Sequence, residues 1–317
     1  MLQTLAEIAG ILTPYFLMIA VGYVLKQTLL RQQDVVSAVN RIVFCVAMPC
    51  KLFYNTALSG LSGGLSGRLC AFAALSLSVT TLLAWLLARA LIADLRVRGT
   101  QIQNAFRCNY TIFGTSIAES FYGAAGLNAA ARVAMVAVPL LNIYAVLTLS
   151  PCCQTSGGKY SLKATALRLA RNPLLIGVLA GTAVGALQIP VPQALLKTAS
   201  MLGNCATPLA FVLLGATFSF ARLRANRLQV IAGTLVRLVL VPLLVLPAAI
   251  ALGFRDAELL VLFTLCGTPV AVVSHITARE MGADGELASQ LVLATSALGL
   301  FSMFLFLFVL RSMGYLA

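Results

Sequence analysis

Charged side chains are scarce in this sequence: they make up 10% of its 317 residues, and only nine residues are acidic. An ordinary soluble domain carries about 25% charged residues. The chain also has a single histidine and no phosphate-binding glycine loop, and no nucleophile stands beside a plausible base. These absences argue against hydrolytic and group-transfer enzymes and against an ATP-driven pump made from this chain alone, so we predict that the protein is not an enzyme.

The cysteines show no spacing that suits a metal ion. Six of the eight lie in apolar stretches, where cysteine behaves as a small hydrophobic residue. The other two, Cys152 and Cys153, fall in a polar segment that we expect to be cytoplasmic and therefore reducing. We accordingly predict no metal site, no structural disulfide and no cofactor.

Apolar residues, in contrast, are in large excess, at 60% of the chain with a mean hydropathy of +0.97. Apolar runs of about 20 residues, enough to cross a bilayer, recur along nearly its whole length. A membrane β-barrel would instead show segments of about 10 residues with alternating polarity. The sequence therefore predicts an all-α membrane protein with ten transmembrane helices, at 8–25, 36–58, 69–92, 101–122, 128–150, 172–188, 197–218, 228–252, 258–278 and 287–310.

The net charge of +13 does not indicate nucleic-acid binding, because the basic residues mark orientation in a membrane. With the N-terminus outside, cytoplasmic connections would hold thirteen of the 22 lysines and arginines and outer segments only four: Arg68, Lys197, Arg255 and Arg311. The positive-inside rule then places both termini outside a cytoplasmic or inner membrane. No basic residue precedes Lys26, so we expect the first helix to be retained rather than cleaved as a signal peptide.

An internal repeat divides the chain. The polar segment 151–171 separates residues 1–150 from 172–317, and scarce residue types recur at a constant offset of 159 residues. The matching pairs are Pro14 with Pro173, Gly22 with Gly181, Pro49 with Pro208, and "GAAG" at 123–126 with "GADG" at 282–285. Each half holds five spans, an odd number, so the halves would enter the membrane in opposite directions. Inverted repeats of this kind are typical of secondary transporters, whose sites lie where broken helices meet.

The corresponding fourth and ninth helices carry the signals for such breaks. In the ninth, Thr268 and Pro269 fall mid-span, where proline removes a backbone donor. In the fourth, the equivalent zone begins at Asn109. Half-helix N-termini there would attract an anion. We name as substrate-binding candidates Asn109, Ser116, Asn142, Thr268 and Pro269; the alternative is that these polar groups serve as packing contacts between helices.

Charges inside the spans need partners or a route to water. Lys51 and Arg107 lie near enough to helix ends to reach an interface, whereas Arg237 lies about 13 Å into its helix at the usual rise per residue. We therefore add Arg237 to the substrate-binding candidates. For coupling, the candidates are His275 and Glu119, although a lone histidine is more often a packing residue.

Six segments in order resemble the auxin efflux carrier family, which includes bacterial malonate and malate permease-like proteins and the PIN exporters. They are "VNRIVFCVAMPCKLF" at 39–53, "RCNYTIFGTS" at 107–116, "RNPLLIGVLAG" at 171–181, "ATPLAFVLLGATFS" at 206–219, "RLVLVP" at 237–242 and "GTPVAVVSHITAREMGADGELAS" at 267–289. The resemblance implies crossing helices beside the substrate, elevator-type alternating access and a homodimer. It also implies that Asn109 and Pro269 are the crossover residues. Where the family commonly has prolines in the fourth helix, this chain has Cys108 and Ser116, which predicts a milder break.

We therefore expect a secondary carrier for small organic anions, either mono- or dicarboxylates, whose partners are that substrate and the lipid bilayer rather than nucleic acid. Two alternatives stay open. One is a sodium-coupled symporter of the bile-acid type, and the other is a membrane sensor that binds its ligand without moving it.

Overall fold

The computed structural model describes residues 13–14, 17–28, 30, 32–58, 67–154, 171–217 and 226–316. Their extended pairing is limited to one bridge between Cys108 and Val270, and the rest is helix and connecting turns. The first half of the chain provides α2 (Gln33–Ile42), η1 (Val43–Ala47), α3 (Met48–Leu58), α4 (Gly67–Leu91), α5 (Leu95–Phe106), α6 (Tyr110–Leu149) and η2 (Ser150–Gln154). The second half provides α8 (Pro173–Leu187), α9 (Gln193–Asn204), α10 (Ala206–Thr217), α12 (Arg227–Leu235), η3 (Val236–Leu240), α13 (Val241–Ala251), α14 (Asp256–Gly267), α15 (Val273–Glu280) and α16 (Gly285–Ser312).

Five helices within the described residues are long and apolar enough to cross a membrane, or six if the two parts of α16, bent by 44°, count as one span. The expected fourth and ninth spans are each divided into two shorter helices, so neither has the continuous length that crossing normally requires. The expected boundary between the fourth and fifth spans is a kink inside α6 at Gly123, whose φ is +53°. The expected first span and linker lie partly outside the described residues. The count of ten helices therefore stays a prediction.

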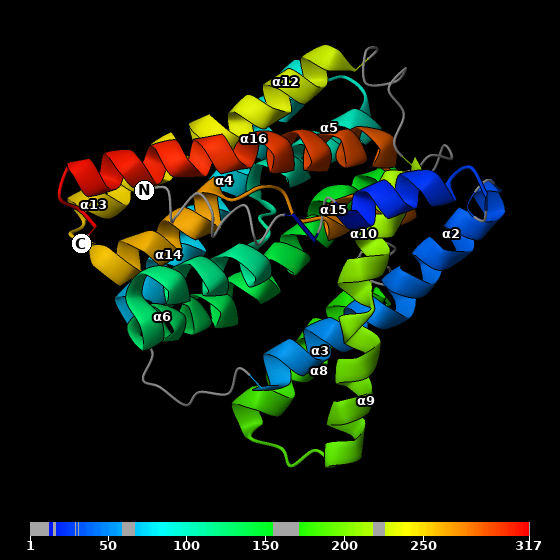
Figure 1. Ribbon diagram of the computed structural model, residues 1–317, viewed down its shortest axis with the longest axis horizontal. Helices are drawn as coiled ribbons and strands as arrows, with labels where there is room; N and C mark the ends of the chain where they lie inside the picture. The colour runs from blue at the N-terminus through cyan, green and yellow to red at the C-terminus, as the bar shows by residue number, and fades with distance from the viewer. Residues whose placement is uncertain are drawn as a thin grey trace.

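The helices form two bodies around two main apolar cores, and α6 contributes residues to both cores. In the first body, α4, α6, α13 and α14 lie together around residues such as Phe72 and Phe263. In the second body, α3, α8 and α9 lie together on the other side of the molecule, as Figure 1 shows, and η1, α8 and α10 provide core residues such as Phe44 and Phe211. The space between the two bodies is where side chains from distant parts of the sequence meet.

α8 packs closely against α3 in the second body. Gly177, Gly181 and Gly185 repeat every fourth residue, so they share one face of α8. A methyl group added at Gly177 would lie 2.6 Å from the carbonyl oxygen of Pro49, and one at Gly185 would lie 2.8 Å from that of Thr56. Small residues in such a row allow membrane helices to approach closely.

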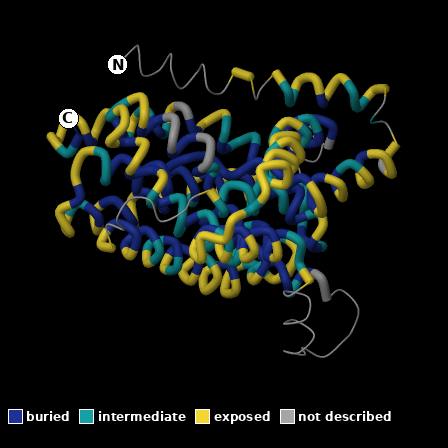
Figure 2. The backbone as a smooth tube through the Cα atoms, turned by 90° about the horizontal axis from the view of Figure 1, so that it is seen from below, coloured by how far each residue is buried: buried dark blue, intermediate teal, exposed yellow. Residues whose placement is uncertain are grey.

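The outer surface of the helices is apolar. Figure 2 shows buried residues running through the interior and exposed residues along the outer helices. Many of these exposed side chains are large and hydrophobic, including Leu82, Leu86, Leu228, Phe301 and Leu305. This is the surface expected of a protein solvated by lipid rather than by water.

Two features of the structure fall at equivalent positions of the proposed repeat. Gly123 and Gly282, which the offset of 159 residues pairs, both have left-handed backbone conformations, with φ of +53° and +73°. The π-helical turn η1 in the first half corresponds by the same offset to the junction of α9 and α10 at Cys205. These agreements support the repeat, which stays a prediction.

Candidate functional site

Two interrupted helices cross at the centre of the structure. α5 ends at Phe106 and α6 begins at Tyr110, while α14 ends at Gly267 and α15 begins at Val273. The first break spans residues 107–109 and the second spans 268–272, so the break without prolines is the shorter one.

The two breaks satisfy each other's backbone groups. The N–H of Asn109 donates to the carbonyl oxygen of Pro269 at 3.0 Å, and the N–H of Ala271 donates to that of Arg107 at 3.0 Å. Unpaired backbone groups at membrane depth cost several kcal/mol each, so exposed breaks would be unstable there. The two hydrogen bonds pair the backbone groups of the two breaks and hold both segments extended at the crossing.

Arg237 hydrogen-bonds to backbone carbonyls next to both breaks. Its side chain is 1% exposed, and it donates to the carbonyl oxygens of Thr268 at 2.9 Å, Ala105 at 2.9 Å and Leu265 at 3.1 Å. These carbonyls belong to the C-terminal end of α5 and to the end of α14 and the residue after it, where an α-helix leaves acceptors without partners. Arg237 is not among the described residues that line the central cavity, and its role in substrate binding stays a prediction.

α16 provides further support for the second break. The hydroxyl oxygen of Thr295 accepts from the N–H of Val270 at 3.2 Å. Gly299 leaves room for the ring of Pro269, since a methyl group at Gly299 would lie 2.6 Å from Cγ of that proline. The hydroxyl of Thr268 donates back to the carbonyl oxygen of Thr264 at 2.7 Å, so this candidate residue also faces away from the cavity.

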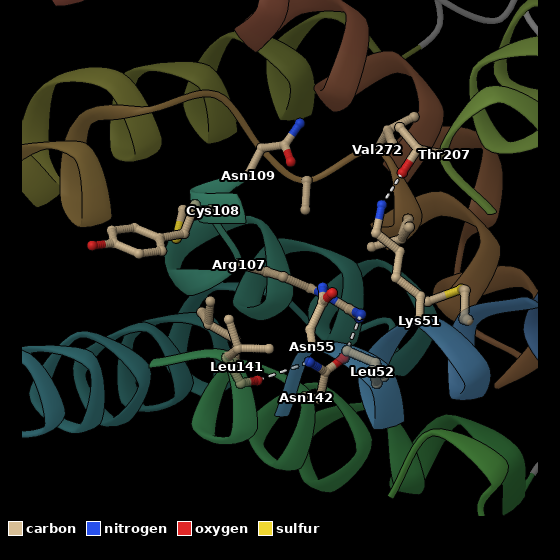
Figure 3. Close-up of a pocket in the computed structure, with 15 residues that line it drawn as sticks. Lys51, Leu52, Asn55, Arg107, Cys108, Asn109, Leu141, Asn142, Thr207 and Val272 are labelled. Carbon is tan, nitrogen blue, oxygen red and sulfur yellow. Dashed lines mark hydrogen bonds between the residues drawn. The ribbon is translucent and has the colours of Figure 1, made fainter. Parts of the chain in front are cut away.

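A cavity of about 90 Å³ lies beside the crossing, between the two bodies. Its wall comes from α3, α6, α10 and both breaks, and Figure 3 shows these elements around it. Among the described residues that line it, none is acidic, and two are basic: Lys51 and Arg107. The charged side chains among these residues are therefore all basic.

Arg107 is held in place by neutral groups. Its side chain is 2% exposed, and its Nη2 donates to Oδ1 of Asn142 at 3.2 Å, while Nδ2 of Asn142 donates to the carbonyl oxygen of Val138 at 2.8 Å. With the amide of Gln103 oriented to satisfy both its ends, its oxygen accepts from Nη1 of Arg107 at 2.6 Å, and its nitrogen donates to the carbonyl oxygen of Ser274 at 3.2 Å. Two amides thus orient the guanidinium without neutralising its charge.

Lys51 approaches the cavity from the opposite body. It lies on α3, and its ammonium group donates to the hydroxyl of Thr207 on α10, as Figure 3 shows. α9 packs directly behind it, because a methyl group at Gly203 would lie 2.7 Å from the Cα of Lys51. Thr207 and the packing of α9 therefore hold Lys51 in place beside the cavity.

Asn109 presents its side chain beside the break in Figure 3. It is the residue before the first turn of α6, yet its amide does not cap that helix. Within the described part of the chain, its side chain forms no hydrogen bond. Both its oxygen and its nitrogen therefore remain available to a ligand.

The remaining candidates from the sequence lie elsewhere. Glu119 is exposed on α6, away from the cavity. His275 is buried on α15, and its Nδ1 lies 2.6 Å from the carbonyl oxygen of Val272. Ser116 belongs to α6, but its side chain lies outside the described part of the structure. The structure thus brings Asn109 and Asn142 to the cavity, and Pro269 to the adjacent break.

Sequence reasoning missed the two basic residues of the cavity. It treated Lys51 and Arg107 as side chains that reach an interface, because each lies within a few turns of an expected helix end. A signal for Arg107 was present, since this residue stands two positions before Asn109 inside the broken segment. For Lys51 only the folded arrangement of α3 against α10 reveals its place.

Comparison with known proteins gives one family. Residues 8–307 match the family described as membrane transport protein. No curated protein matches the chain.

Proposed function

Because this chain belongs to the membrane transport protein family, that of the auxin efflux carriers, it is a membrane-embedded, multi-pass transporter, and we propose that it is a secondary carrier for small organic anions. The cavity at the crossing is the observation that carries this proposal. It contains Lys51, Arg107 and the free amide of Asn109, and no acidic residue of the described part of the chain lines it. A carboxylate ligand would meet charge-assisted donors on both sides.

The position of the cavity supports alternating access. Lys51 and Thr207 lie on α3 and α10, which contribute to the second core, whereas Asn109 and Asn142 lie next to Tyr110 and Leu141 of the first core. Movement of one body along the other, as in an elevator, would open such a cavity to one side of the membrane at a time. In this proposal the protein lies in the cytoplasmic or inner membrane with both termini outside, as an inverted repeat and a homodimer.

A sodium-coupled symporter is the second candidate, and the cavity lining favours it less. Sodium prefers oxygen ligands, and carboxylates near the crossing would be expected to provide some of them. Glu119 is exposed, His275 is buried on α15, and neither is among the described residues that line the cavity, so neither provides an evident coupling group there. We therefore propose exchange or uniport of the anion without sodium.

Counterflow in proteoliposomes tests the proposal. The full chain is reconstituted, loaded with an unlabelled acid, and supplied with the same acid in labelled form outside, with and without sodium and proton gradients. The panel contains malonate, malate, a monocarboxylate and indole acetate. We expect labelled acid to accumulate transiently for at least one member without any sodium gradient.

Other results would change the assignment. Counterflow that requires sodium would favour the symporter. Specific binding of an acid without counterflow would favour a sensor, and neither binding nor counterflow of any acid by folded protein would overturn the anion assignment.

A further inference from the structure

The connection between α4 and α5 joins an apolar helix end to a group of arginines. α4 is one of the five helices that are long and apolar enough to cross a membrane, and it ends at Leu91. Leu87 and Leu91, in its last turns, are 60% and 80% exposed. Large apolar side chains this exposed suit lipid rather than water, so this end of α4 lies where the hydrocarbon of a bilayer meets its headgroups.

Trp85 marks the same level of the membrane. It is the only tryptophan of the sequence, and it lies about 9 Å before the end of α4 at the usual helical rise. The guanidinium carbon of Arg89 lies 5.3 Å from the centroid of its ring, within the range of a cation–π contact. Tryptophan is enriched at membrane interfaces, so this contact holds the charge of Arg89 beside the headgroups.

Arg98 is held at the same connection by hydrogen bonds to the backbone. Its Nε donates to the carbonyl oxygen of Ile92 at 2.7 Å, and its Nη2 donates to that of Ala93 at 3.1 Å. These carbonyls directly follow α4, where a helix leaves acceptors without partners. Arg96, two residues earlier in the chain, is exposed.

The carboxylates nearest to these arginines are engaged elsewhere. Asp94 is the N-cap of α5 and accepts from the N–H of Arg96 at 2.8 Å. Asp284 is also close, since its N–H donates to the carbonyl oxygen of Arg96 at 3.2 Å, but its carboxylate accepts from two N–H groups in the first turn of α16. Both carboxylates therefore cap helices, and the positive charge of the connection is left to an anion from outside the protein.

We propose that the α4–α5 connection binds an anionic phospholipid, with the phosphate on Arg89, Arg96 and Arg98 and an acyl chain along Leu87 and Leu91. The planar guanidinium can donate two parallel hydrogen bonds to a phosphate. Basic residues at the membrane surface favour anionic over zwitterionic lipids, whose own cation offsets the phosphate. A free phosphate compound would leave the exposed leucines without a contact, so the lipid fits the surface better.

The position of this lipid site gives it a structural consequence. α5 begins at the connection and ends next to the first break, so a lipid bound there holds the end of α5 that lies away from the crossing. None of the three arginines lines the cavity at the crossing. The site is therefore separate from the one proposed for the transported anion.

Quenching by brominated lipids measures occupancy of the site directly, because the only tryptophan lies in it. The purified full chain is reconstituted in phosphatidylcholine vesicles that contain a fixed minor share of brominated phosphatidylglycerol or, in parallel, of brominated phosphatidylcholine with the same acyl chains. Fluorescence is then compared with that in unbrominated vesicles. We expect an affinity for phosphatidylglycerol about fivefold or more above that for phosphatidylcholine, the ratio that one basic residue near an anionic surface produces.

Two variants connect this preference to the arginines. Arg89→Gln/Arg96→Gln keeps Trp85 and should reduce the preference about fivefold or more. Its quenching by brominated phosphatidylcholine should stay that of the wild type, which shows that the variant is folded and that Trp85 still contacts lipid. Arg311→Gln removes a positive charge at an exposed position of α16 and should retain the full preference.

Equal quenching of the wild type by the two brominated lipids would overturn the proposal, as would an undiminished preference in the double variant. A further arm adds glycerol 3-phosphate, with sodium chloride of equal ionic strength as its control. We expect the preference to be the same in both solutions, and its loss in glycerol 3-phosphate alone would mean that the arginines bind free phosphate compounds instead. No transported acid enters the experiment, so its result is independent of the proposed function.

Discussion

The backbone N–H of Asn109 donates to the carbonyl oxygen of Pro269 across the crossing of two broken helices, at 3.0 Å. These residues lie 160 positions apart in the chain, and each sits where its helix is interrupted. Their contact compensates the backbone groups that the breaks expose, and it places the amide of Asn109 beside a cavity with two basic residues.

Replacement of Arg237 should affect stability rather than substrate affinity. Arg237→Gln removes charge-assisted hydrogen bonds to three backbone carbonyls, each worth about 1.5 to 3 kcal/mol, and one amide cannot replace them all. We expect lower yield and a lower melting temperature in detergent, while folded protein keeps the wild-type KM for malonate. Arg311→Gln, at an exposed position of α16, is the matched control and should melt as the wild type does. A normal melting temperature with a greatly raised KM would instead place Arg237 at the substrate.

A carboxylate beside Arg107 should compete with the substrate. Asn142→Asp puts a negative charge where Oδ1 of Asn142 now lies 3.2 Å from the guanidinium, so it neutralises the charge that the anion needs. We expect malonate affinity to fall about tenfold or more, because a charge-assisted contact is lost. Asn128→Asp makes the same change at an exposed position of α6 and should leave affinity unchanged. Equal affinities for both variants, as measured by direct binding, would show that Arg107 does not contact the ligand.

The ring of Pro269 needs the space that Gly299 leaves. In Gly299→Ala the added methyl group would lie 2.6 Å from Cγ of the proline, closer than side chains tolerate, so the ring of Pro269 must move and disturb the second break. We expect the counterflow rate to fall about tenfold, the effect of losing one buried hydrogen bond. Gly67→Ala is the control, because a methyl group there meets nothing within 4 Å. Counterflow at the wild-type rate in both variants would mean that the position of Pro269 is not critical.

The sequence predicted the class of the protein better than the partners of its buried charges. Apolar runs indicate membrane helices because the bilayer demands length and hydrophobicity, and Pro269 marks a break because it lacks a backbone donor. The partner of a buried charge is different, since it depends on which helices meet. Arg237 therefore looked like a ligand for an anion, although backbone carbonyls of α5 and α14 surround it. Lys51 looked like an interfacial lysine, although α10 supplies Thr207 beside it in the interior.

The break in the fourth helix was also predicted from Asn109, but not the way in which it is stabilised. The fourth expected span has no proline near this residue, and Arg107 and Asn109 adopt non-helical conformations where Ala271 and Pro269 pair with them. The residues around each break contain no sequence pattern that would predict a hydrogen bond to a segment so far away in the chain.

Counterflow of labelled malonate by Asn109→Ala, compared with the wild type in proteoliposomes of equal protein content, tests the central claim most directly. The side chain of Asn109 forms no hydrogen bond within the described residues, so its removal should leave the melting temperature in detergent near that of the wild type. The account predicts counterflow by the wild type and none above empty liposomes for the variant. Wild-type counterflow by Asn109→Ala would contradict the assignment of the substrate to the crossing.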